Sequence, residues 1–110
     1  MKFLVVSKMK DVFFALPPPV QLQIVEASQT GMELQKQAGK ILDYYYSPAG
    51  YNIIIIEYKS AEEWAADQAS VPVVTYGNHE VYPLTDGFPL LKNTVKNLKA
   101  AAQAFPKPLK

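Results

Sequence analysis

The chain has 110 residues, a length that fits one domain around one hydrophobic core. Its composition, 49% hydrophobic and 19% charged, argues against an intrinsically disordered protein. Its formal net charge of +1 predicts no strong attraction to nucleic acid or to an anionic membrane. The chain has no cysteine, which excludes disulfides, thiol nucleophiles and thiolate metal sites.

Residues 2–8 form the first predicted strand, whose apolar residues, Phe3 to Val6, point to both faces of a sheet. This apolar run is too short for a signal peptide or a membrane span, so we expect a cytoplasmic protein. Three prolines at 17–19 suit the first turn of a helix, which is predicted to begin close to Pro18 or Pro19 and to end at Gly39. Gly31 lies within its apolar stripe, either for close approach to a strand or as room for a ligand.

Two further strands are predicted at 40–46 and 51–59, joined by a type I turn over Ser47-Pro48-Ala49-Gly50. Ser60 is expected to cap a short helix over 61–69. A fourth strand follows at 78–84, and Pro83 places it at an edge of the sheet or at its own end. The last helix is predicted at 88–105, and residues 106–110 should form a loose tail.

This order of elements is typical of one α+β domain over residues 1–105. It predicts a ferredoxin-like β-α-β-β-α-β fold with an additional C-terminal helix. We expect a four-stranded antiparallel sheet with the first and third strands in the middle. Right-handed crossovers should place the first two helices on the same face.

The opposite face of the sheet has no predicted helix of its own, although Ile53 to Ile56 alternate between the two faces. An exposed apolar surface of this size usually marks a contact surface. We therefore expect a homodimer in which two sheets pack against each other. The alternative cover is the C-terminal helix, folded under its own sheet.

Several short motifs resemble those of one family. They are a strand that ends in Tyr46-Ser47-Pro48, a Gly50-Tyr51 that opens the next strand, the helix start Ser60-Ala61-Glu62-Glu63, the later Pro72, and the run Glu80-Val81-Tyr82-Pro83-Leu84-Thr85-Asp86. Over residues 1–86 the chain resembles the muconolactone isomerase-like members of the dimeric α+β barrel superfamily. The resemblance implies a dimer, and the superfamily includes cofactor-free isomerases and small monooxygenases.

The hairpin offers a candidate ligand site. If Tyr46 faces Tyr51 across the turn, Tyr45 pairs with Asn52 and Asp43 with Ile54. One face then carries polar groups on an apolar floor, a mixture that suits a small-molecule pocket; these groups are Asp43, Tyr45, Asn52 and Tyr58. The alternative is that the tyrosines simply suit strands and that their hydroxyls meet water.

Two candidate bases follow from the sequence. Asp43, a carboxylate in an apolar strand, is the first choice, and His79, the only histidine, is the second. Trp64, in the short helix, is either core or a pocket wall, and Phe13 and Phe14 either fill the core or cover a pocket. With one histidine and no recognisable carboxylate spacing, we expect no metal site, and no nucleotide-binding motif is present.

These observations predict a dimer that binds a small, partly apolar molecule. If the protein is an enzyme, the resemblance implies cofactor-free isomerisation or monooxygenation of a small cyclic or aromatic compound. The alternative is a non-catalytic dimeric module that binds a metabolite or another protein. We expect no cofactor, no nucleic acid and no membrane among its partners.

Overall fold

The computed structural model describes residues 1–105, and the predicted tail at 106–110 lies outside them. Four antiparallel strands form one open sheet: β1 (Lys2–Met9), β2 (Ile41–Ser47), β3 (Tyr51–Glu57) and β4 (Gly77–Leu84). The strand order is β2-β3-β1-β4, so β1 and β3 lie at the centre. The helices are α1 (Asp11–Phe14), α2 (Pro18–Gln37), α3 (Ala61–Asp67) and α4 (Gly87–Ala104), with two 3-10 turns, η1 (Gln68–Ser70) and η2 (Pro72–Tyr76). The α+β class is thereby confirmed.

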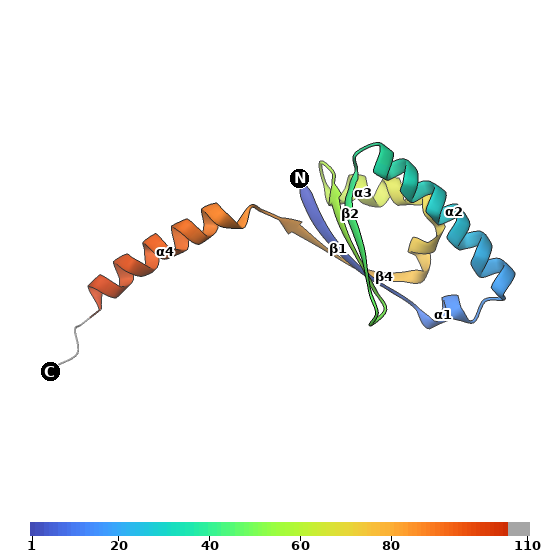
Figure 1. The fold of residues 1–110 in the computed structure, drawn as a ribbon, viewed down its shortest axis with the longest axis horizontal. Coiled ribbons are helices and arrows are strands. Elements are labelled where there is room, and N and C mark those ends of the chain that lie inside the picture. The colour runs from blue at the N-terminus through green and yellow to red at the C-terminus, as the bar shows by residue number, and fades with distance from the viewer. Residues whose placement is uncertain (106–110) are drawn as a thin grey trace.

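One face of the sheet is covered by the chain itself. Helices α1, α2 and α3 all lie on that side in Figure 1, which we call the helix face. Alternate residues of β1 point to it, and Phe3, Val5 and Ser7 are buried there. Phe3 and Val5 form the core with Ile56 and Tyr58. This core is small for the length of the chain, because α2 packs on η1, η2 and β2 and because α4 lies apart from the sheet.

The long helix α2 begins at Pro18 and is followed by Gly39 in a left-handed conformation (φ 76°), as predicted. Its buried residues are Ser28, Gly31 and Gln35, and Leu34 of the apolar stripe is 60% exposed. A Cβ built on Gly31 would lie 2.2 Å from the backbone oxygen of Ser70. Gly31 therefore serves close approach, as one interpretation held, but the approach is to η1 and not to a strand.

The hairpin register differs from the prediction by one residue. Ser47 faces Tyr51, Tyr46 faces Asn52, and Tyr45 faces Ile53. The cause is a three-residue loop, 48–50, in which Gly50 adopts a positive φ of 96° and donates its N–H to the Ser47 carbonyl. A bulge between Ile41 and Asp43 leaves Leu42 as an additional residue in β2.

The second face of the sheet, which we call the outer face, carries apolar side chains from all four strands. Leu4, Val6, Ile53 and Ile55 are half-buried at its centre, while Tyr45 and Tyr82 are more exposed around them. Helix α4 does not fold beneath this face but extends away from the end of β4 (Figure 1). The alternative in which the C-terminal helix covers its own sheet is therefore wrong.

Candidate functional site

A cavity of about 550 Å³ lies between α2 and the helix face of the sheet. It exists because α2 packs its small residues, Ser28 and Gly31, against η1 and η2. Ser28 fixes this arrangement, since its hydroxyl donates to the Ile24 carbonyl (2.6 Å) and accepts from the Val73 N–H (2.9 Å). The space left between helix and sheet is lined mainly by apolar side chains. A volume of this size and character suits a small organic molecule.

His79 and Ser7 form the first polar group in the wall of this cavity. The imidazole Nε2 lies 2.8 Å from the Val74 carbonyl oxygen, and Nδ1 lies 2.5 Å from the Ser7 hydroxyl. Because a carbonyl can only accept, Nε2 donates to Val74, and Nδ1 of the neutral ring accepts from Ser7. Trp64 meets the imidazole edge-on, with ring centroids 6.2 Å apart. These contacts fix the tautomer and the orientation of the ring.

Tyr44 and Asn52 form the second polar group of the cavity wall. The Tyr44 hydroxyl donates to Asn52 Oδ1, which leaves the Asn52 amide N–H groups as potential donors to a ligand. Burial, with a smaller contribution from the nearby Tyr46, raises the pKa of Tyr44 above its usual value. The Tyr44 hydroxyl therefore stays protonated near neutral pH and remains a hydrogen-bond donor.

One row across the sheet joins the two polar groups through Asn52, Ser7 and His79, while Tyr44 lies in the neighbouring row, opposite Ile54. In the strand register, Ser7 lies directly opposite Asn52 on one side and directly opposite His79 on the other. Directly opposed residues have Cβ atoms about 4.5–5.5 Å apart. The row Asn52, Ser7 and His79 therefore presents donors and acceptors within reach of a single small molecule. This row can position an oxygen-bearing group, and its Ser7–His79 pair can accept a proton.

The structure divides the predicted site residues between the two faces. His79, Asn52, Trp64, Phe13 and Phe14 all line the cavity, with Phe13 buried and Phe14 exposed. Asp43 pairs with Ile55 and Tyr45 with Ile53, so both lie on the outer face, and the proposed cluster with Asn52 does not form. Asp43 is thus no base for a ligand in this cavity.

Tyr58 also lies outside the cavity. It is 5% exposed within the core, and its hydroxyl donates to Asp67 Oδ2 at 2.6 Å. Burial and this hydrogen bond raise the pKa of Tyr58, whereas the same bond is the main cause that lowers the pKa of Asp67. Lys40 contacts the same carboxylate oxygen at 3.2 Å. The role of Tyr58 is therefore to tie the end of β3 to the end of α3.

Sequence reasoning did not identify Ser7 and Tyr44 as site residues. Ser7 carried a signal, because it is a polar residue in an otherwise apolar central strand. Tyr44 carried none beyond its place among three consecutive tyrosines. No cluster of three potential metal ligands occurs within residues 1–105, and no helix in this range is long and apolar enough to cross a membrane.

No family model matches the chain, and no curated protein is similar to it. The solved structures that are similar include the X-ray crystal structure of protein Atu4242 from Agrobacterium tumefaciens, at 18% sequence identity and a TM-score of 0.42. The match covers 78% of this chain and 95% of that one. A similarity at this level adds no argument about function, so the muconolactone isomerase-like assignment stays a prediction.

Proposed function

We propose that this protein is a homodimer of ferredoxin-like subunits that binds a small, mostly apolar molecule in the cavity between α2 and the sheet. The observation that carries this proposal is the cavity itself, which combines about 550 Å³ of largely apolar space with one row of polar side chains. The apolar part of the ligand lies against Ile54, Ile56 and Val71. An oxygen on the ligand accepts a hydrogen bond from the Asn52 amide.

Trp64 offers a direct assay, because it is the only tryptophan and lines the cavity. Titration with a panel of phenols and cyclic enones should change its fluorescence in a saturable way. Asn52→Leu should weaken binding about tenfold, as expected for one lost hydrogen bond of about 1.4 kcal/mol. Tyr45→Phe is the control, since Tyr45 lies on the outer face.

Two results would contradict this proposal. One is that no member of the panel saturates and native mass spectra show no carried molecule. The other is that Tyr45→Phe weakens binding as much as Asn52→Leu does, because the ligand would then lie on the outer face.

The dimer is supported by the apolar outer face, whose central aliphatic side chains are only half-buried and so realise only part of the about 1.5–3 kcal/mol that full burial of each contributes. Ile55 lies at its centre, paired with Leu4 and Asp43. Ile55→Lys should therefore yield monomers in sedimentation experiments. Ala49→Lys adds the same charge in the exposed hairpin loop and should leave the dimer intact.

A second candidate function is cofactor-free proton transfer, such as isomerisation of a cyclic enone, and the Ser7–His79 hydrogen bond favours it. A bound substrate could pass a proton to the Ser7 oxygen as the Ser7 proton moves to His79 Nδ1, while Val74 holds the opposite nitrogen. Ser7→Ala and His79→Gln should then both abolish exchange of the proton beside the carbonyl, measured by NMR in D2O. Exchange that survives both changes would leave binding as the function.

A further inference from the structure

Helix α4 carries an apolar stripe that no other part of residues 1–105 covers. Leu91, Val95, Leu98 and Ala102 recur at spacings of four and three, which aligns them along one side of the helix. Every residue from Gly87 to Ala104 is exposed, with Leu98 at 63%. Most of the stability of such a helix comes from packing its apolar side, so this stripe requires a cover.

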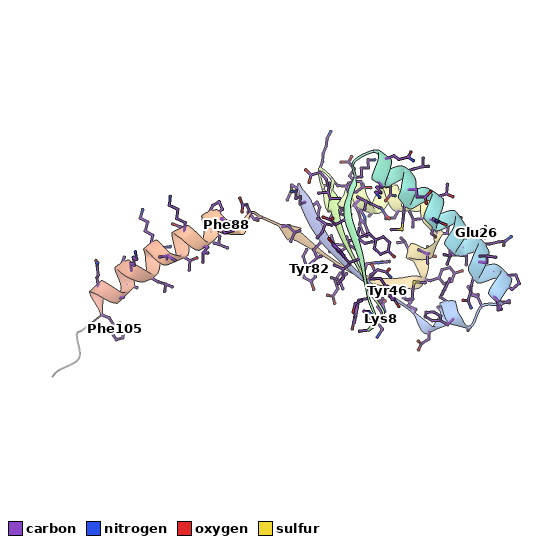
Figure 2. All side chains as sticks on the ribbon, in the orientation of Figure 1. Lys8, Glu26, Tyr46, Tyr82, Phe88 and Phe105 are labelled. Atoms are coloured by element: carbon purple, nitrogen blue, oxygen red, sulfur yellow. The ribbon has the colours of Figure 1, made fainter. Side chains whose placement is uncertain are left out.

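The shape of the chain indicates that this cover lies on another molecule. The radius of gyration is 20.7 Å, whereas a compact chain of this length has about 13 Å. The longest dimension is 74 Å against 30 Å and 21 Å for the other two. In Figure 2 the labelled side chains of Phe88 and Phe105 mark the two ends of α4, and no other element lies beside them. Helix α4 is thus an arm.

Charge distinguishes the two surfaces that could pack on the apolar stripe of α4, namely a second α4 and the body of another copy. Residues 87–104 contain three lysines (Lys92, Lys96 and Lys99) and no carboxylate. Residues 1–86 contain six lysines and ten carboxylates, a formal charge of −4. Two copies of α4 packed on each other would bring like charges together, whereas α4 and the body of another copy have opposite charges. The body of a second copy is therefore the complementary surface.

One surface of the body has the required combination of apolar and acidic groups. Three residues that line the cavity are each about half exposed or more and so mark an edge where it meets solvent: Phe14 on α1, Val25 on α2 and Tyr44 on β2. We call this edge the mouth. Glu33 also lines the cavity, and Glu26 is adjacent to Val25 on α2. Lys36 on α2 lines the cavity as well, so Glu26, Glu33 and Lys36 together carry a formal charge of −1. The mouth thus pairs an apolar rim with a small net negative charge, as α4 pairs an apolar stripe with lysines.

We propose that α4 is an exchanged arm that closes the mouth of the cavity in a second copy of the chain. The inference rests on the proposed sheet-to-sheet dimer. In such a dimer, a twofold axis along the strands brings the β4 edge over the β2 edge of the other copy, on the outer face. To reach the mouth on the helix face, α4 must turn back at residues 85–86 and pass around that β2 edge, so the closed arm differs from the extended one in Figure 1. The lengths agree, since α4 spans about 27 Å and α2 about 30 Å. Each cavity is then completed by the other subunit, and a ligand enters or leaves when the arm detaches.

The absence of cysteine from the chain makes a clean cross-linking test possible. A Val25→Cys protein is mixed with a Val95→Cys protein that carries a mass tag, and the mixture is oxidised. We expect a disulfide between the two different chains. Asn93→Cys, on the opposite side of α4, is the matched control and should cross-link at least about tenfold less.

A second measurement does not depend on disulfide geometry. Val95→Lys should raise the dimer dissociation constant by about tenfold or more, because it places a charge in the apolar contact. Asn93→Lys adds the same charge on the polar side and should leave this constant unchanged. Both constants are measured by sedimentation velocity, with the wild-type protein alongside.

The outcomes separate this inference from the proposed function. A wild-type protein that stays monomeric at high concentration overturns both the dimer and the exchanged arm. A dimer that resists Val95→Lys, or that gives mainly Val95–Val95 cross-links between two α4 helices, overturns the arm alone. So does an intrachain disulfide in a Val25→Cys/Val95→Cys protein. If the expected cross-link forms but no ligand is found to bind in the cavity, the exchanged arm is supported and the binding proposal is contradicted.

Discussion

Gly31→Ala tests the contact that creates the cavity. The new Cβ would lie 2.2 Å from the Ser70 oxygen and 3.2 Å from Val71 Cγ2. Because the closest atom belongs to the backbone, α2 and η1 must separate by about 1 Å before an ordinary contact is reached. Overpacking of this kind costs about 1–3 kcal/mol, and alanine returns about 1 kcal/mol through helix propensity. Because the clash is with backbone, the overpacking cost lies at the upper end of this range, and we expect a net destabilisation of about 2 kcal/mol.

The assay is urea unfolding at fixed protein concentration, followed by Trp64 fluorescence. Gly31→Ala should lower the midpoint with an unchanged slope, and a thermal melt should fall by about 4–8 °C for each kcal/mol lost. Gly87→Ala is the matched control, because nothing lies within 4 Å of its Cβ position and its φ is not positive. A Gly31→Ala protein as stable as the wild type would refute the close approach of α2 to η1.

Three further predictions concern the core and the helix ends. Tyr58→Phe removes the hydrogen bond that lowers the pKa of Asp67. This bond stabilises the folded state above the pKa of Asp67 in the unfolded chain, near 4, and its stabilisation is lost as the pH falls through the lower pKa of Asp67 in the folded state. We expect the free energy of unfolding to fall by about 1 kcal/mol at pH 7, which is modest for a hydrogen bond to a charged group because the Asp67 side chain is 34% exposed. In urea unfolding, the difference from wild type should shrink below about pH 4. Ser60→Ala removes the cap on the Glu63 N–H (3.1 Å) and should cost about 1 kcal/mol by the same assay, whereas Ser60→Asp should preserve it. Ile56→Val, at a side chain that is 1% exposed, should cost about 0.5–1.5 kcal/mol in thermal melts, and a larger loss would mean that the core cannot relax around the missing methyl group.

The secondary-structure elements were predictable because start and stop signals lie in the sequence next to their ends. Pro18 and Gly39 mark the ends of α2, and the cap at Ser60 marks the start of α3. These signals act within one or two turns of chain and need no knowledge of tertiary contacts. The antiparallel sheet followed from the order of the elements.

The composition of the site was not predictable for a physical reason. Side chains alternate between faces, so a hairpin register that is wrong by one residue exchanges Tyr44 for Tyr45. The choice depended on Gly50, whose positive φ makes the loop three residues long. Ser7 and His79 are separated by 72 residues, and only the β1–β4 register brings them together. Short-range patterns do not contain that information.

The two edge strands of the open sheet, β2 and β4, each carry a feature that opposes edge-to-edge association of sheets. A bare edge strand can template a neighbouring chain through its free N–H and C=O groups. The additional residue at Leu42 interrupts the regular hydrogen-bonding frame of β2, and Pro83 removes one donor from β4. Lateral growth by strand addition is thereby discouraged at both sides, which leaves association through faces and arms as the route to finite assemblies.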